Sequence, residues 1–156
     1  MIELDIPGWG RRTIEHIVMD FNGCLGFEGR LIEGVDERLP LLSLRSRLHI
    51  CTADTFGTVK EQTRPFECAL KILSPANQDQ QKMELVRKVG PMNCVAIGNG
   101  RNDVLMLKEA ALGIAILGPE GMASDLLETS DVIVVDINDA LDLLLNPKRL
   151  TATLRR

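Results

Sequence analysis

Short apolar runs rich in β-branched residues alternate with helix-like segments along most of the chain, and this alternation constrains the fold more than any other feature. Continuous apolar runs suit strands that are buried on both faces, and strands joined by helical crossovers pair in parallel. We therefore expect an α/β, Rossmann-like fold with three layers, in which helices cover both faces of one parallel sheet. The expected strands are 14–19, 48–51, 68–73, 94–97, 113–117 and 132–135, and the expected helices are 36–46 (capped by Asp36), 55–63, 78–89, 101–111, 121–129 and one through Leu141 to Leu145.

The N-terminal residues follow a different pattern. Residues 2–6 alternate between apolar and polar with period two, residues 7–10 form a Pro- and Gly-rich turn, and residues 12–19 are extended again. This pattern predicts a β-hairpin whose second arm becomes the first strand of the sheet. Four glycines bracket residues 27–32, which we expect to form a small flap beside that strand.

The composition is that of an ordinary globular chain. The 156 residues are 45% hydrophobic and 26% charged, with a formal net charge of −4. This balance gives no electrostatic footprint for nucleic acid, and no apolar run approaches the roughly 20 residues that cross a membrane. The N-terminus lacks a signal-peptide pattern, so we expect a cytoplasmic single domain over residues 1–156 with no nucleic-acid or membrane partner.

The cysteines and histidines give no metal or redox motif. The four cysteines form no Cys-x-x-Cys pair and have no histidine at metal-ligand spacing. Cys51, Cys68 and Cys94 lie in apolar runs and are expected to be buried free thiols, whereas Cys24 is expected at the rim of the site described next. The two histidines have no nucleophile as a partner and are expected to be structural.

Polar residues with chemical potential gather where the expected strands end. In open α/β sheets, ligands bind in the crevice outside the carboxyl ends of the strands. Each of these residues alone has an ordinary structural interpretation as a turn former, helix cap or solvated residue. Their placement on separate strand ends indicates one site. The first strand delivers Asp20 and Asn22, the second delivers Thr52 and Asp54, the later loop delivers Asn99, Asn102 and Asp103, and Lys82 opens the preceding helix.

This set matches the parts that phosphoryl transfer needs: a nucleophile, a divalent cation, a cradle for the phosphoryl oxygens and a neutralising charge. Asp20 is the candidate nucleophile, and Asp20 and Asp103, with the carbonyl of Asn22, are candidate Mg²⁺ ligands. Thr52 and the loop amides around Phe21 and Asn22 are candidates to hold the phosphoryl oxygens, with Lys82 paired against them.

The motifs resemble those of the haloacid dehalogenase (HAD) superfamily. Asp20-Phe21-Asn22-Gly23-Cys24-Leu25 is similar to its Asp-x-Asp-Gly-Thr-Leu signature, and closer still to the Asp-Lys-Thr-Gly-Thr motif of P-type ATPases. Thr52-Ala53-Asp54 resembles their Thr-Gly-Asp, Gly98-Asn99-Gly100-Arg101-Asn102-Asp103 resembles their Gly-Asp-Gly-x-Asn-Asp, and Leu112-Gly113-Ile114-Ala115-Ile116 resembles their next strand. Lys82 takes the place of the family lysine. The resemblance is to the small soluble P-type-ATPase-like members.

The resemblance implies a Mg²⁺-dependent phosphoric monoester hydrolase that forms an aspartyl-phosphate on an unknown phosphorylated substrate. About thirty residues separate each motif from the next, up to Lys82, so neither gap holds a large cap. An open site implies a phosphorylated small molecule or macromolecule as substrate, and a homo-oligomer that covers the pocket. The implied catalytic residues are Asp20, Asn22, Thr52, Asp54 and Lys82; the substrate-binding residues are Phe21, Asn22, Gly23, Thr52, Ala53, Lys82 and Asn102; the metal ligands are Asp20, Asn22, Asn99 and Asp103.

Two asparagines depart from the family pattern. Asn22 stands where the family has the acid that protonates the leaving group, and an amide cannot exchange a proton in that way; such a group contributes about 10²–10⁴ in rate. Asn99 replaces a carboxylate metal ligand. We therefore expect slow turnover, with Asp54 as a possible substitute for proton transfer. The main alternative is a catalytically weak or inactive phosphate- or metal-binding regulatory protein, and a receiver-like phosphoacceptor domain fits less well.

Overall fold

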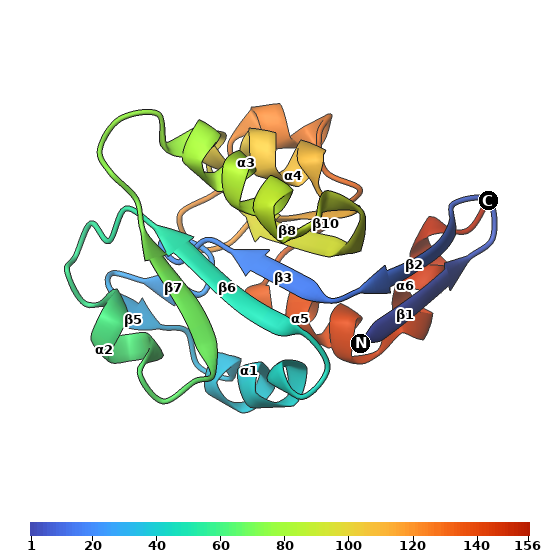
Figure 1. Cartoon of the computed structure of the whole chain (residues 1–156), viewed down its shortest axis with the longest axis horizontal. Helices are drawn as coiled ribbons and strands as arrows, with labels where there is room; N and C mark the ends of the chain where they lie inside the picture. The colour runs from blue at the N-terminus through green and yellow to red at the C-terminus, as the bar shows by residue number, and fades with distance from the viewer.

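A parallel sheet of six strands lies at the centre of the structure, a computed structural model that describes residues 1–156 (Figure 1). All neighbouring strands in this sheet pair in parallel, and the strand order is β10-β9-β8-β3-β6-β7. The predicted α/β class is confirmed. The strands are β3 (His16–Met19), β6 (Arg47–Thr52), β7 (Cys68–Ile72), β8 (Cys94–Gly98), β9 (Leu112–Ile116) and β10 (Val132–Val134).

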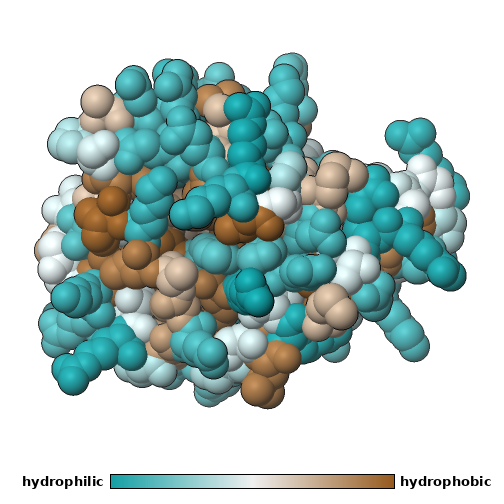
Figure 2. Space-filling model, in the orientation of Figure 1, coloured by the Kyte–Doolittle hydropathy of each residue, from teal (hydrophilic) through white to brown (hydrophobic).

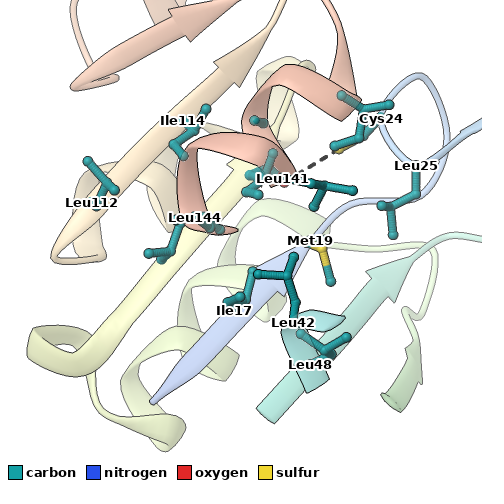
Figure 3. Close-up of a cluster of buried hydrophobic side chains, with 14 of the residues drawn as sticks. Ile17, Met19, Cys24, Leu25, Leu42, Leu48, Leu112, Ile114, Leu141 and Leu144 are labelled. Atoms are coloured by element: carbon teal, nitrogen blue, oxygen red, sulfur yellow. Dashed lines mark hydrogen bonds between the residues drawn. The ribbon is translucent and has the colours of Figure 1, made fainter. Parts of the chain in front are cut away.

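Helices cover both faces of the sheet, because the inner strands are apolar on both sides. On one face, α1 (Val35–Ser43) and α5 (Ile137–Leu145) pack into the larger buried cluster, where Figure 3 shows Leu141 and Leu144 among strand side chains such as Ile17 and Ile114. On the other face, α3 (Gln78–Val89) and α4 (Val104–Glu109) build a smaller cluster. The predicted three-layer arrangement is therefore present.

The N-terminal hairpin stands beside the last helix, at one end of the molecule (Figure 1). It consists of β1 (Ile2–Ile6) and β2 (Gly10–Ile14), and its inward side chains pack with Leu150 of α6 (Pro147–Leu154). The hairpin was predicted, and the chain does continue into the central sheet at β3. However, β2 itself pairs only with β1, because the arm breaks between Ile14 and His16.

Several predicted helices are shorter in the structure than the sequence pattern suggested. Helix α1 begins after Gly34, at φ 87°, so Asp36 lies in the first turn and is not the cap. The helix expected over 55–63 is only α2 (Val59–Thr63), because the Asp54 carboxylate accepts from the amide of Val59. The helix expected over 121–129 is only the 3₁₀ turn η3 (Ser124–Leu127). The helix expected over 101–111 starts as the 3₁₀ turn η2 (Arg101–Asp103) and continues as α4.

The remaining elements are short. Residues 26–31 form the predicted flap as a small hairpin of β4 (Gly26–Phe27) and β5 (Arg30–Leu31), and η1 (Pro91–Asn93) precedes β8. With this hairpin and α1 alone between β3 and β6, and α2 and β7 alone between β6 and α3, no large cap is present, as predicted. None of the helices combines the length and apolar character that a membrane crossing requires.

Two predictions about cysteines need correction. Cys24 is fully buried in the larger core cluster, with its thiol 3.9 Å from the carbonyl of Ile97, so it is not at the rim of the site (Figure 3). Cys68 is only partly buried, because it lies on the edge strand β7. Cys51 and Cys94 are buried as expected.

The strand order fixes where a ligand site lies. From β3 the chain moves outward through β6 and β7, and it then returns to the other side of β3 to form β8, β9 and β10. The connection therefore reverses direction between β3 and β8, and crevices at such switch points bind ligands outside the carboxyl ends of the strands. Asp20 follows β3 and Asn99 follows β8 at this point. Figure 2 shows the face over edge strand β7, where hydrophobic residues lie between hydrophilic ones; Ile72 of this strand is half exposed.

Candidate active site

Three charged side chains meet at the switch point. The Lys82 ammonium lies 2.6 Å from Asp103 Oδ1 and 3.0 Å from Asp20 Oδ1. Lys82 extends from α3, Asp20 follows β3 and Asp103 ends η2, so three separate segments deliver the charges. Lys82 and Asp103 have no solvent exposure, while Asp20 keeps a small exposed fraction. The arrangement places Asp20 nearest to solvent, with the cation behind it.

Burial and mutual charge set the protonation of this group. Burial, and then the neighbouring Asp103 carboxylate, raise the pKa of Asp20 to about 7, and Lys82 opposes the rise. Burial alone would lower the pKa of Lys82, but Asp103 and Asp20 outweigh it and raise the pKa above its ordinary value. Lys82 is therefore a permanent cation here. Its charge supports the ionised, nucleophilic form of Asp20.

Asp103 also shapes the loop that follows β8. Its Oδ2 accepts from the amides of Asn99 and Gly100, at 3.0 and 2.9 Å, while Oδ1 accepts from Lys82. A side chain at residue 98 would collide with Asp103, since a Cβ there would lie 2.4 Å from its carboxylate. Gly98 therefore allows the loop to close tightly around this carboxylate. The conformation fixes the Asn99 side chain toward the crevice.

Asn22 faces the second strand end. Its amide nitrogen lies 3.2 Å from the Thr52 hydroxyl, to which it donates. Thr52 also accepts from the amide of Asp54, at 3.1 Å. The Asp54 carboxylate, in contrast, is turned away and accepts from the Val59 amide at the start of α2. In this structure the Asp54 carboxylate is bound to the first residue of α2, and its role in proton transfer stays a prediction.

A cavity of about 200 Å³ opens between these strand ends. It is polar and contains one carboxylate from the first motif, hydroxyls from the second and amides from the third. Of the predicted site residues, Phe21, Gly23, Asp54, Lys82 and Asp103 do not line it; Phe21 is buried and Lys82 and Asp103 lie behind Asp20. The lining residues are Asp20, Asn22, Thr52, Ala53, Thr55, Gln78, Asn99, Gly100, Asn102 and Glu120.

Asn102 lies on the side of the cavity formed by α3. Its amide donates to the Gln78 side chain at 3.3 Å, and Gln78 is the first residue of α3. This contact joins the loop after β8 to the helix that carries Lys82. Gln78, Thr55 and Gly100 also line the cavity but were not singled out from the sequence. Gln78 and Thr55 carry no charge and belong to no motif, so only their position beside the cavity in the structure assigns them to the site.

Glu120, an exposed carboxylate at the cavity rim, was also not singled out from the sequence. It belongs to the loop that follows β9, whose carboxyl end lies at the same sheet edge as that of β8. The strand-end argument that located Asp20 and Asn99 applies equally to this third loop. The turn-forming run Gly118-Pro119-Glu120-Gly121 was the available signal.

The donors at this site fit a hydrated divalent cation. The structure holds no cluster of three or more His, Cys, Asp or Glu side chains arranged to bind a metal ion. Mg²⁺, however, is commonly held by one or two carboxylates together with waters and substrate phosphate. Asp20, the amide oxygen of Asn99 and the carbonyl of Asn22 supply oxygen donors of that kind. The predicted ligand Asp103 lies behind them, with its two oxygens bonded to Lys82 and to the loop amides, so it supports the site from the second layer.

Known sequences with similarity to this chain fall into two groups. No family model matches the chain. The chain is 54% identical over 74 residues to the protein named Uncharacterized protein MJ0073 from Methanocaldococcus jannaschii, which covers 47% of this chain and 80% of that protein. The chain belongs to the same family as MJ0073. It is also 35% identical over 81 residues to the phospholipid-transporting ATPase tat-1 of Caenorhabditis elegans, which is 50% of this chain but only 7% of the transporter.

Solved structures with a similar fold are phosphatases and hydrolases by name. One is 3-deoxy-D-manno-octulosonate 8-phosphate phosphatase from Moraxella catarrhalis, in complex with magnesium, phosphate and KDO, with a TM-score of 0.67, 19% identity and coverage of 89% of this chain and 90% of that one. Another is a hydrolase of the haloacid dehalogenase-like family, SP0104 from Streptococcus pneumoniae, with a TM-score of 0.63, 16% identity and coverage of 83% and 97%.

The chain has the fold of these haloacid dehalogenase-like phosphatases and hydrolases. Identities of this size to the solved structures show the fold alone, and the match to tat-1 adds the P-type-ATPase-like character of the sequence. This HAD-like chain has the expected motifs at the expected strand ends, with Asn22 and Asn99 at the two positions where it departs from the superfamily pattern.

Proposed function

We propose that this HAD-like chain is a Mg²⁺-dependent phosphohydrolase that works through an aspartyl-phosphate on Asp20. The observation that carries the proposal is the convergence of Asp20, Lys82 and Asp103 within 3.0 Å contacts beside a polar cavity at the switch point of the sheet. A buried carboxylate that is paired with a permanent cation and keeps one face toward a cavity is suited to nucleophilic attack. The similarity to solved phosphatase folds supports this assignment.

The proposed reaction has two steps, formation and hydrolysis of an aspartyl-phosphate. A carboxylate oxygen of Asp20 attacks the phosphorus of a phosphate monoester, and the bond from phosphorus to the ester oxygen breaks. The alcohol leaves with a proton from water. A second water then attacks the phosphorus of the aspartyl-phosphate, which releases inorganic phosphate and restores the Asp20 carboxylate. Thr52 and the loop amides near Asn22 orient the phosphoryl oxygens, and Lys82 offsets negative charge around Asp20.

A divalent cation would add charge stabilisation that the side chains alone do not provide. Asp20, the amide oxygen of Asn99 and the carbonyl of Asn22 are the groups that would hold it, and Asp103 would support them from behind through Lys82 and the loop amides. Bound Mg²⁺ would polarise the phosphoryl oxygens as a Lewis acid. The Moraxella phosphatase of similar fold was solved with magnesium and phosphate, which supports Mg²⁺ as the cation.

Asn22 determines the turnover rate that we expect for the proposed enzyme. In the superfamily pattern an acid at this position donates a proton to the leaving group, and here an amide donates to Thr52 instead. Losing a positioned general acid or base costs about 10²–10⁴ in rate. We therefore propose slow turnover, with hydrolysis of the aspartyl-phosphate slow enough for the intermediate to accumulate.

The cavity limits the substrate class. At about 200 Å³ it is smaller than the roughly 300–1,000 Å³ of typical small-molecule sites. It therefore has room for a phosphoryl group, and the rest of the substrate lies outside, on a surface that no large cap covers. A phosphorylated small molecule or a phosphorylated macromolecule both fit this description. The homo-oligomer expected to cover the site stays a prediction, which light scattering during size-exclusion chromatography would measure.

The second candidate is a phosphate- or metal-binding regulatory protein. The hydrogen bond from the Asn22 amide to Thr52 favours this candidate. It places an amide, which cannot transfer a proton, at the cavity position where the superfamily pattern has an acid. Such a protein would bind phosphate without catalysing its release from an ester.

Hydrolysis of an aryl phosphate separates the two candidates. Wild type is measured with Mg²⁺ and with EDTA, next to Asp20→Asn and the control Asp125→Asn, which removes an exposed carboxylate paired with Arg101. The phosphohydrolase proposal predicts metal-dependent turnover in wild type and the control, and none in Asp20→Asn. Turnover that survives in Asp20→Asn would exclude the nucleophile. Phosphate binding without any turnover in wild type would favour the regulatory protein.

A further inference from the structure

The loop after β9 is tied to the loop after β8 at several points. Residues 118–121 form a turn in which the Gly121 amide donates to the Gly118 carbonyl at 3.3 Å. The Asn99 side-chain amide donates to the Gly121 carbonyl at 3.1 Å, and the Asn99 carbonyl accepts from the Ala123 amide at 2.9 Å. Glu120 lies inside this tethered turn. Its backbone is therefore held at the cavity rim although its side chain is exposed.

Glu120 and Asn99 flank the same point, above Gly23. A Cβ added at Gly23 would lie 2.6 Å from Glu120 Oε2 and 2.5 Å from Asn99 Nδ2. The two side chains therefore approach each other across the space left by this glycine. Asn99 uses its nitrogen to bind Gly121, so its oxygen is the atom left for a ligand. A carboxylate from another loop thus lies beside the position where the superfamily pattern has an acid.

The charge of Glu120 indicates what it faces. A carboxylate beside a phosphoryl group repels it, unless a cation lies between the two. Asp20 and Asp103 against Lys82 leave one negative charge in the site, and Glu120 makes two. Two negative charges match one divalent cation. A role in holding a cation is therefore consistent with an anionic substrate, whereas direct contact with the phosphate is not.

We propose that Glu120 supplies the carboxylate that the chain lacks at Asn99, and that it helps to hold a hydrated divalent cation through the waters of that cation. The proposal rests on the metal-dependent function above and adds a residue that the motifs do not contain. Mg²⁺ keeps several of its waters in proteins. Carboxylates that accept hydrogen bonds around a metal site are commonly worth about 10–100-fold in metal affinity.

The test measures binding of the metal alone. Mn²⁺ prefers the same oxygen ligands as Mg²⁺, and the signal of free Mn²⁺ in electron paramagnetic resonance reports its binding. The variants are Glu120→Gln, which removes the charge, and Glu120→Asp, which keeps it on a shorter side chain. Glu128→Gln is the control, because it removes an exposed carboxylate from the neighbouring segment that does not line the cavity. Asp20→Asn reports on the metal site itself.

The inference predicts about tenfold weaker Mn²⁺ binding in Glu120→Gln, a smaller loss in Glu120→Asp and no change in Glu128→Gln. Equal affinity in wild type and Glu120→Gln, with weaker binding in Asp20→Asn, would overturn the role of Glu120 and leave the proposed function standing. Equal losses of Mn²⁺ affinity in Glu120→Gln and Glu128→Gln would mean that the loss reflects only the net charge of the protein, and this would also overturn the role of Glu120. Wild type that binds no Mn²⁺ would count against both the inference and the metal-dependent function.

Discussion

The buried ammonium of Lys82 lies 2.6 Å from the carboxylate of Asp103, and neither side chain reaches solvent. This pair links α3 to the loop after β8, and a second contact of the same ammonium reaches Asp20. One ammonium group thus contacts carboxylates from two other segments of the site. We therefore expect Lys82 to contribute both to the stability of the fold and to the charge of the site beside the cavity.

Replacing Lys82 should therefore affect both. In Lys82→Met the two buried carboxylates lose their cation, and breaking a buried ion pair from one side costs about 3 kcal/mol in the free energy of unfolding. Urea denaturation without metal measures this loss. Lys88→Met on the exposed face of the same helix is the control and should change stability by less than about 0.5 kcal/mol. Similar stability in both variants would contradict the inferred importance of the pair.

Gly23 and Gly57 offer a matched comparison. Both have positive φ, +74° and +69°, but a Cβ at Gly23 meets Asn99 and Glu120, whereas nothing lies within 4 Å of one at Gly57. Gly57→Ala should lose about 1 kcal/mol from backbone strain alone. Gly23→Ala should lose more, and it should also displace the two side chains at the cavity rim. Urea denaturation and Mn²⁺ titration measure the two effects, and an unchanged metal affinity in Gly23→Ala would argue against the crowded rim.

The histidine pair at the opposite end of the sheet predicts a pH dependence of stability. His16 Nδ1 and His49 Nε2 lie 2.9 Å apart. Burial and then the charge of His16 lower the pKa of His49 from 6.5 to about 4, and burial also lowers the pKa of His16. The folded state therefore holds fewer protons than the unfolded state between these values. Stability should fall as the pH drops from about 6.5 toward about 4.

The comparison with His49→Gln isolates this effect, because Asp20 titrates in both proteins. Glutamine can still form a hydrogen bond to His16 but takes up no proton. The free energy of unfolding of the variant should fall less steeply with decreasing pH than that of wild type. Parallel curves for the two proteins would show that the pair contributes nothing to the pH dependence.

The sheet and the main site were predictable because their signals are local. Each strand is a short apolar run; Asp20 and Asn99 follow such runs directly, and Asp103 lies in the same loop as Asn99. Helix α3 was predicted with the observed bounds, because a periodic apolar face ends at a Gly-Pro stop. Parallel pairing and the covered faces follow from this alternation.

The errors arise where contacts distant in sequence decide the local structure. Residues 121–123 cannot continue a helix because Asn99 binds Gly121 and Ala123. Cys24 was expected at the rim because it follows Asp20 closely, but the tight turn after Phe21, in which the Phe21 carbonyl accepts from Cys24 and Gly26, directs the thiol into the core. The turn around Glu120 follows a strand end and was a local signal, but the hydrogen bonds between the loops after β8 and β9 that hold Glu120 at the cavity rim join residues distant in sequence. No local pattern reports these contacts.

Asn22 is the residue that limits the proposed enzyme. In Asn22→Asp the Thr52 hydroxyl can donate to the new carboxylate while it still accepts from the Asp54 amide, so the local structure tolerates the change. Supplying the general acid and base should raise aryl phosphate turnover roughly 10²-fold or more. Gln80→Glu adds an acid at an exposed position and is the control. An unchanged or lower rate in Asn22→Asp would contradict the assigned cause of slow turnover.

Detection of the phosphoryl group on Asp20 tests the central claim most directly. Wild type is mixed with Mg²⁺ and an aryl phosphate, quenched in acid, digested and mapped by mass spectrometry. We predict one phosphoryl group on the peptide that contains Asp20, absent in Asp20→Asn and less abundant in Asn22→Asp, where its hydrolysis is faster. A wild type that hydrolyses the substrate without phosphorylated Asp20, or a phosphoryl group that persists in Asp20→Asn, would contradict the account.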